Sequence, residues 1–243
     1  MQPREDRFTV RAFDCQPDGR IKPNTLMQYL QEAATRHAEQ LGVGFADLDR
    51  QNCFWVLVNF RIELDDWPRW SEGVTIRTWP SGCTRASASR EFVGRNSEDR
   101  EFFRADSEWM ILDKRSNRPR NLSKLDLHLP PAGPKVLAET LRRLQPAEGY
   151  ASAYTLRVPF SALDFNGHVN NTEYFCWALD GLHHTLGNWP EIRSLQATYL
   201  AEVFEGDEIE VLVAGPINSH IRILERRLDD STHTNVFLME LHC

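Results

Sequence analysis

Apolar residues recur along the chain at two spacings, one typical of helices and one typical of strands. From Leu26 they follow an i, i+3, i+4, i+7 pattern, which predicts a helix that buries one face. Gly42 and Gly44 end this pattern, as glycines often do after a helix. The same spacing returns from about Asn170 and predicts a second long helix.

Segments rich in β-branched and aromatic residues surround each predicted helix, one before it and four after it, and they are typical of strands. They cover residues 8–13, 55–64, 74–79, 88–95 and 102–112 in the first half, and 154–160, 195–204, 208–215, 220–228 and 235–241 in the second. Each half is therefore predicted to be α+β, most simply an antiparallel sheet wrapped around one helix.

The two halves share one order of elements, which indicates a duplication. A chain of 243 residues with 41% hydrophobic content can form two domains with real cores. Between the halves, LPPAGPK and PAEGY flank VLAETLRRL, which predicts a short helix in a proline-bounded linker. We expect an N-terminal domain over residues 1–130, a linker over 131–149 and a C-terminal domain over 150–243.

Three polar residues stand at alternate positions of the sequence DFNGHVNN, at the predicted start of the second helix: Asp164, Asn166 and His168. The corresponding stretch of the first half, from Gln16, reads QPDGR and lacks the acid, the amide and the imidazole at those positions. Taken singly, Asp and Asn are as well explained as helix caps, and the histidine as an ordinary hydrogen-bonded side chain. Their spacing and the contrast between the halves favour a catalytic site in the second half alone.

Glu202 is a further candidate, on the predicted strand over residues 196–204. Alternation along that strand places it on the same face as Leu200 and Phe204. A carboxylate among apolar neighbours suits a general base. The alternative is a solvent-facing glutamate, because two further acids follow closely.

The DFNGHVNN motif together with Glu202 resembles the acyl-acyl carrier protein thioesterases, and the resemblance covers nearly the whole chain. It implies a tandem, or double, hotdog, each half a long central helix wrapped by a roughly five-stranded antiparallel sheet. It also implies hydrolysis of fatty acyl-acyl carrier protein to free fatty acid, with the acyl pocket in the first half and catalysis in the second. The residues implied as catalytic are Asp164, Asn166, His168 and Glu202.

The residue types fit thioester hydrolysis. The start of a helix can hold the carbonyl oxygen as it gains negative charge, and His168 can move a proton between water and the departing thiol. Asn166 can orient the thioester or the water, while Asp164 can act as nucleophile or hold the helix start and the histidine. In the family the glutamate is often followed by cysteine, whereas Val203 stands here, which favours attack by water or a carboxylate.

Three other functions remain open from the residues. Single-hotdog acyl-CoA thioesterases also carry an Asp ahead of Gly-His-Val-Asn-Asn, although two fused halves and Glu202 weigh against that carrier. Enoyl-thioester hydratases of related folds space Asp and His five apart, but Asp164 and His168 are four apart. A non-catalytic acyl-binding protein would lack the polar residues in both halves, and only the first half lacks them.

Charge and composition limit the possible partners. The formal net charge of −7 argues against broad nucleic-acid binding. Residues 114–143 nevertheless carry eight basic and two acidic residues, a local net of +6. This basic segment could dock the acyl carrier protein, or it could be a solvated connector. The family also makes a homodimer an expectation, although two fused halves allow a monomer.

No apolar run is long enough to cross a membrane, and five cysteines without a CxxC pair indicate a reducing compartment, so we expect a cytoplasmic protein. No nucleotide-binding loop, GxSxG elbow or HExxH motif is present, and the histidines show no metal-ligand spacing. The sequence thus implies neither a cofactor nor a metal.

Overall fold

The computed structural model describes residues 2–128, 131–164, 167–187, 189–217, 219–229 and 232–243. The chain divides into two compact units, Met1–Leu141 and Arg142–Cys243. This division falls inside the predicted linker. No helix among the described residues is both long enough and apolar enough to span a bilayer.

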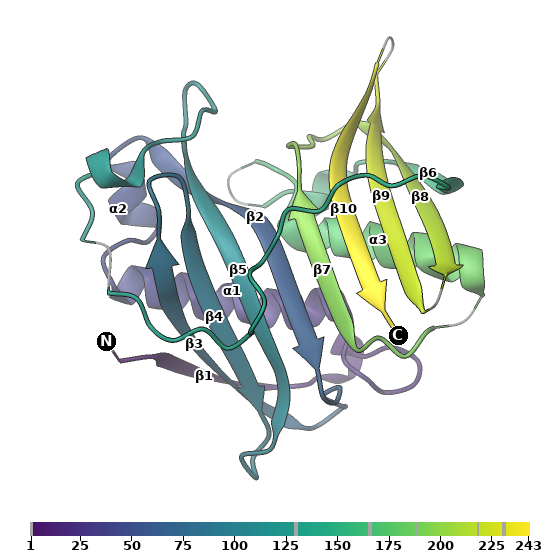
Figure 1. Cartoon of the computed structure of the whole chain (residues 1–243), viewed down its shortest axis with the longest axis horizontal. Helices are drawn as coiled ribbons and strands as arrows, with labels where there is room; N and C mark the ends of the chain where they lie inside the picture. The colour runs from purple at the N-terminus through teal and green to yellow at the C-terminus, as the bar shows by residue number, and fades with distance from the viewer. Residues whose placement is uncertain (1, 129–130, 165–166, 188, 218, 230–231) are drawn as a thin grey trace. The chain divides into compact units, whose positions relative to one another are not determined.

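The first unit holds the long helix α1 (Pro23–Gln40), the short helix α2 (Phe45–Asp49) and five strands. The strands are β1 (Arg4–Thr9), β2 (Cys53–Leu64), β3 (Gly73–Cys83), β4 (Ala88–Arg95) and β5 (Glu101–Asp113). They pair antiparallel in the order β1-β3-β4-β5-β2, and α1 runs along one face of the sheet (Figure 1). Short 3₁₀ turns cover Ala12–Asp14 and Leu122–Lys124.

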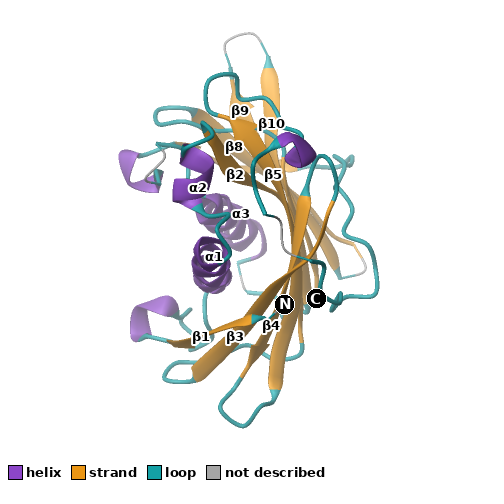
Figure 2. Cartoon of the chain, turned by 90° about the vertical axis from the view of Figure 1, so that its left-hand side faces the viewer, coloured by secondary structure: helices purple, strands orange, loops and turns teal. Residues whose placement is uncertain are grey.

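The second unit repeats this arrangement around α3 (Asn171–Leu186), with a 3₁₀ turn over Phe160–Ala162. Its strands are β6 (Ala151–Arg157), β7 (Ser194–Tyr199), β8 (Glu208–Ile217), β9 (His220–Leu228) and β10 (His233–His242). They pair antiparallel in the order β7-β10-β9-β8-β6. In Figure 2 α1 lies on one side of the strands of the first unit, and α3 lies on one side of the strands of the second, so the α+β prediction is confirmed for both halves.

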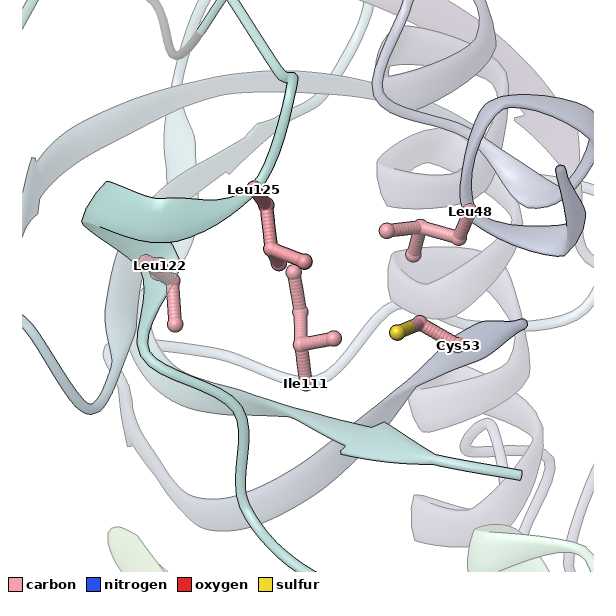
Figure 3. Close-up of a cluster of buried hydrophobic side chains, with 5 residues drawn as sticks. All are labelled: Leu48, Cys53, Ile111, Leu122 and Leu125. Carbon is pink, nitrogen blue, oxygen red and sulfur yellow. The ribbon is translucent and has the colours of Figure 1, made fainter. Parts of the chain in front are cut away.

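The core of each unit lies between helix and sheet. In the second unit the buried face of α3 includes Tyr174, Phe175, Ala178 and Leu182. Gly181 lets this helix approach β8 closely, because a Cβ there would lie 2.6 Å from the Val211 side chain. The first unit has a further apolar cluster under α2 (Figure 3), formed by Leu48, Cys53, Ile111, Leu122 and Leu125.

One tight turn occurs in both units at the same distance before the long helix. In the first unit Gln16 N–H donates to the Arg20 carbonyl over 2.8 Å, and Gly19 takes a φ of 83°. In the second, Asp164 N–H donates to the His168 carbonyl over 2.8 Å. This shared hydrogen bond and its shared distance from the helix support duplication.

Several predicted elements differ in the structure. The strands predicted over 8–13 and 154–160 lie earlier, at β1 and β6, and 3₁₀ turns stand near the ends of those ranges. The helix predicted over VLAETLRRL is absent, since residues 136–139 form bends and 140–144 belong to no helix or strand. Its amides bond to side chains instead: Val136 N–H donates to the Glu91 carboxylate, and Leu144 N–H donates to the Thr198 hydroxyl. The strand predicted over 196–204 ends at Tyr199, so Glu202 lies in a loop after β7.

Candidate active site

The turn that carries His168 is closed by its own backbone and by Asp164. Gly167 N–H donates to the Asp164 carbonyl over 3.0 Å, with Gly167 at a φ of 78°. Nothing lies within 4 Å of a Cβ built on Gly167, so its backbone angle, not crowding, favours glycine. The Asp164 carboxylate also accepts from His168 N–H over 3.3 Å. Asp164 thus fixes the backbone that presents the imidazole.

The polar turn lies ahead of the helix, not in its first turn. The cap of α3 is Asn170, whose side chain accepts from both the N–H and the hydroxyl of Thr172 over 2.9 Å. Glu173 N–H donates to the Asn170 carbonyl over 2.9 Å. These bonds engage two of the amides that the sequence had suggested for a substrate oxygen. Asn166, the third predicted residue of the motif, lies outside the described residues.

His168 and Glu202 meet within the second unit although 34 positions separate them in sequence (202 − 168). His168 Nδ1 lies 3.2 Å from Glu202 Oε1, and their side chains are 29% and 28% exposed. Hydrogen bonding to Glu202 raises the pKa of His168 against the opposing effect of burial, and the charge of Asp164 adds to the rise. The pair can therefore keep a proton on His168 Nδ1, while Nε2 takes up and releases a second proton.

The loop that carries Glu202 is held from three sides. Leu200 N–H and Ala201 N–H both donate to the Val236 carbonyl, over 2.8 and 3.3 Å, where the β7 ladder ends. The Arg227 guanidinium donates to the Glu202 carbonyl over 3.2 Å. Phe204 N–H donates to the Asp207 carboxylate over 2.9 Å.

Phe204 gives the imidazole an apolar neighbour, since its ring meets that of His168 edge-on at 5.7 Å. Phe204 is 42% exposed, so apolar surface lies open to solvent at the histidine. Phe160, four positions before Asp164 in sequence, is 75% exposed. Neither Phe204 nor Arg227 was predicted as part of the site. The alternation around Glu202 could have pointed to Phe204, whereas no sequence pattern links Arg227 to a loop 25 residues earlier (227 − 202).

One group of metal-ligating residues exists among the described residues, and it lies elsewhere in the second unit. It consists of His220, Glu240 and His242 on β9 and β10. Their sequence spacing gave no sign of this cluster, because the strand pairing brings them together.

Fold and site together define a tandem hotdog protein in which the histidine of a polar turn in the second half meets a carboxylate from the loop after β7. The chain belongs to the acyl-ACP thioesterase family. Its residues 3–125 match the model of the acyl-ACP thioesterase N-terminal domain, and residues 146–238 match that of the C-terminal domain.

Known relatives agree with this assignment. A chloroplastic palmitoyl-acyl carrier protein thioesterase of Arabidopsis thaliana is 26% identical over 222 residues, which cover 85% of this chain and 54% of the relative. The chloroplastic oleoyl-acyl carrier protein thioesterase 2 of the same plant is 26% identical over 226 residues, 86% of this chain and 62% of the relative. The chain thus spans little more than half the length of these curated relatives.

Solved structures show the same fold. An acyl-ACP thioesterase from Bacteroides thetaiotaomicron superposes with a TM-score of 0.84 at 23% identity, covering 99% of this chain and 97% of that one. The 12:0-ACP thioesterase from Umbellularia californica superposes with a TM-score of 0.80 at 18% identity, covering 99% and 96%. The double-hotdog prediction is confirmed.

Proposed function

We propose that this protein hydrolyses the thioester of fatty acyl-acyl carrier protein and releases free fatty acid, which ends chain elongation. Membership of the acyl-ACP thioesterase family and the names of its relatives support the reaction and the carrier. The observation that carries the chemistry is the 3.2 Å approach of His168 Nδ1 to Glu202 Oε1.

In the proposed mechanism the Glu202 carboxylate accepts a hydrogen bond from His168 Nδ1–H and so orients the imidazole. His168 then takes a proton at Nε2 from water as the water oxygen attacks the thioester carbonyl. Collapse of the tetrahedral intermediate breaks the carbon–sulfur bond, and the imidazolium returns the proton to the departing thiolate. The products are the fatty acid and the carrier thiol.

Asp164 serves this scheme as a positioning residue through its contact with His168 N–H. Attack by the Asp164 carboxylate is the competing route and would form an acyl anhydride with the enzyme. A single turnover in ¹⁸O-labelled water tests this route, because label in Asp164 shows that water has opened an anhydride at the Asp164 carbonyl. Opening at the acyl carbonyl labels the fatty acid, as direct water attack does, so trapping of an acyl-enzyme with hydroxylamine is the second readout. Asn166 keeps its predicted role of orienting the thioester or the water.

The acyl carrier protein is the proposed partner, docking on the basic segment of residues 114–143. Within this segment Lys114 pairs with Asp49 at 2.6 Å and Arg120 pairs with Asp113 at 2.9 Å. Arg142 and Arg143 are exposed, and they are the better candidates for contacting an acidic partner. We also retain as proposals a homodimer and a cytoplasmic location. For the parts of the chain we retain an acyl pocket in residues 1–130, a linker over 131–149 and a catalytic half over 150–243.

The direct test compares carriers. Purified protein is given a long-chain acyl-acyl carrier protein and the matching acyl-CoA, and thiol release is followed. We expect a higher kcat/KM with the carrier protein substrate. Equal or reversed kcat/KM values would assign the protein to the acyl-CoA thioesterases. Binding of the acyl group without hydrolysis would show a non-catalytic acyl-binding protein.

A further inference from the structure

We propose that His220, Glu240 and His242 form a binding site for a divalent cation of the zinc type on the sheet of the second unit. Each offers one ligand atom, and these atoms all lie within 4.8 Å of one another. Two imidazoles and one carboxylate are donors that zinc accepts, with further positions left for water.

Strand pairing sets the positions of the three side chains. His220 and His242 are partners across β9 and β10, and Glu240 lies two residues before His242 on the same face. Backbone bonds hold both strand ends: Cys243 N–H donates to the Ser219 carbonyl over 3.0 Å, and Arg193 N–H donates to the His242 carbonyl over 2.8 Å. The ligands therefore stand on a rigid ladder instead of on loops.

The contacts within the cluster leave the ligand atoms directed at one another. His220 Nε2 lies 3.4 Å from Glu240 Oε2, yet among the described residues this buried nitrogen has no hydrogen-bond partner. The rings of His220 and His242 stack in parallel at 4.4 Å. The other carboxylate oxygen, Glu240 Oε1, accepts from Arg222 over 2.9 Å. That bond orients Glu240 and leaves Oε2 for the metal.

The uncharged imidazole is the form that binds metal. Protonating both rings would place like charges in stacked contact. Burial lowers the pKa of His242, and His220 adds to this effect. Arg222 opposes a cation, so we expect micromolar affinity instead of the tighter binding of structural zinc sites. Hard cations such as Mg²⁺ prefer oxygen ligands and are not expected to bind.

This cation site is separate from the proposed reaction centre. His242 pairs with Ser194 at the first residue of β7, whereas Glu202 follows the last residue of that strand. Six strand residues at about 3.3 Å each span roughly 20 Å. The faces of the sheet also differ. His220, Arg222 and Leu224 share the face of β9 that packs Leu144. Glu225 lies on the opposite face, next to Ala178 of α3.

The test is titration of the purified full chain, first stripped with a chelator, with Zn²⁺ alone by isothermal titration calorimetry. We expect one zinc per chain, at least about tenfold weaker binding in His220→Ala and in His242→Ala, and no binding of Mg²⁺. His233→Ala is the matched control, since His233 lies at the opposite end of β10. The melting temperature of the wild type should rise by roughly 5–10 °C at zinc concentrations about 100 times the Kd.

Melting curves without zinc show whether each variant is folded, and Glu240→Gln provides a third variant that keeps the side-chain size. The proposal fails if zinc binds no better than millimolar, or if binding is equal in wild type, His220→Ala and His242→Ala. Unchanged thioester hydrolysis after chelation is expected, so failure of the cation site and failure of the proposed function give separate results.

Discussion

Arg227 donates a hydrogen bond of 3.2 Å to the backbone carbonyl of Glu202 and so ties the loop after β7 to strand β9. The same guanidinium bonds to Asp229 over 3.0 Å and lies 3.7 Å from Asp207. Arg227 is therefore the side chain that holds the backbone of Glu202 itself, between the bonds of Leu200 and Ala201 on one side and that of Phe204 on the other.

Arg227→Gln should lower kcat by roughly tenfold with little change in KM, because it loosens the loop that places Glu202 without touching the thioester. The acid limb of the pH–rate profile should also move to lower pH as Glu202 loses its position on His168. Arg227→Lys should restore part of the rate. The control is Arg226→Gln, whose side chain pairs with Glu210. A profile unchanged in Arg227→Gln would reduce Arg227 to a purely structural residue.

The pH dependence of hydrolysis should follow His168. Its neutral form is the proposed base, and Glu202 raises its pKa above the ordinary value of 6.5. In the wild type kcat/KM should therefore increase with pH through a value above 6.5. In Glu202→Gln the residual activity should show this limb shifted downward, because the carboxylate no longer stabilises the imidazolium. An upward or absent shift would contradict the pairing.

The same pair has a stability consequence. A histidine with a raised folded-state pKa contributes stability that is fully present below its unfolded value and is lost as pH rises through the folded value. His168 therefore stabilises the fold in mildly acidic solution, while its activity requires higher pH. Melting temperatures of wild type and Glu202→Gln should differ more at pH 5 than at pH 9, and the opposite order would count against the pairing.

Glu225 is a fully buried acid on the helix-facing side of β9. Neither carboxylate oxygen has a hydrogen-bond partner among the described residues. Burial raises its pKa well above the ordinary value, against a weaker effect of the Ala178 amide. The folded state therefore keeps a proton that the unfolded chain releases, so stability falls as pH rises above the unfolded value.

Glu225→Gln should accordingly stabilise the protein at pH 8, by about 1–3 kcal/mol, and much less at pH 4. Thermal or urea unfolding at the two pH values measures this difference. Glu208→Gln on the neighbouring strand is the matched control, since that glutamate is exposed. Destabilisation at pH 8 that becomes smaller at pH 4 would contradict this account, because it would show that the folded state uses the ionised carboxylate.

Charge reversal tests the docking proposal. Arg142→Glu with Arg143→Glu should raise KM for acyl-acyl carrier protein several-fold and leave kcat near the wild-type value, because an exposed charge acts mainly on encounter. Hydrolysis of acyl-CoA should not change. Arg7→Glu reverses an exposed charge outside the basic segment and serves as control. Equal KM values in all variants would make the segment a solvated connector.

Much of this architecture could be predicted from periodicity. Both long helices and most of the strands follow from the spacing of apolar residues, because burial of one face imposes that spacing. The first strand of each half, predicted over 8–13 and 154–160, lies three or four residues earlier, at Arg4–Thr9 and Ala151–Arg157. The predicted strand through Glu202 ran too far, since apolar alternation from Leu200 to Phe204 continues after the ladder bonds have ended at Val236. The predicted linker helix was wrong because the leucines of the segment do not form one shared apolar face. Leu144 packs by itself on Leu212, Leu224 and Leu238.

The site was only partly accessible to sequence reasoning. The motif pointed to His168 and Asp164 because a polar triplet interrupts an apolar helix start in one half only. Arg227, like the grouping of His220 with Glu240, depends on strand register, which a single sequence does not specify.

The most direct test of the central claim is a double-mutant cycle on His168 and Glu202, read as kcat/KM with long-chain acyl-acyl carrier protein. Each of His168→Ala and Glu202→Gln should lower the value by roughly 10²-fold or more, and the double variant should be little worse than His168→Ala alone. Folded single variants with wild-type turnover, or losses that multiply in the double variant, would contradict a reaction centre built from this pair.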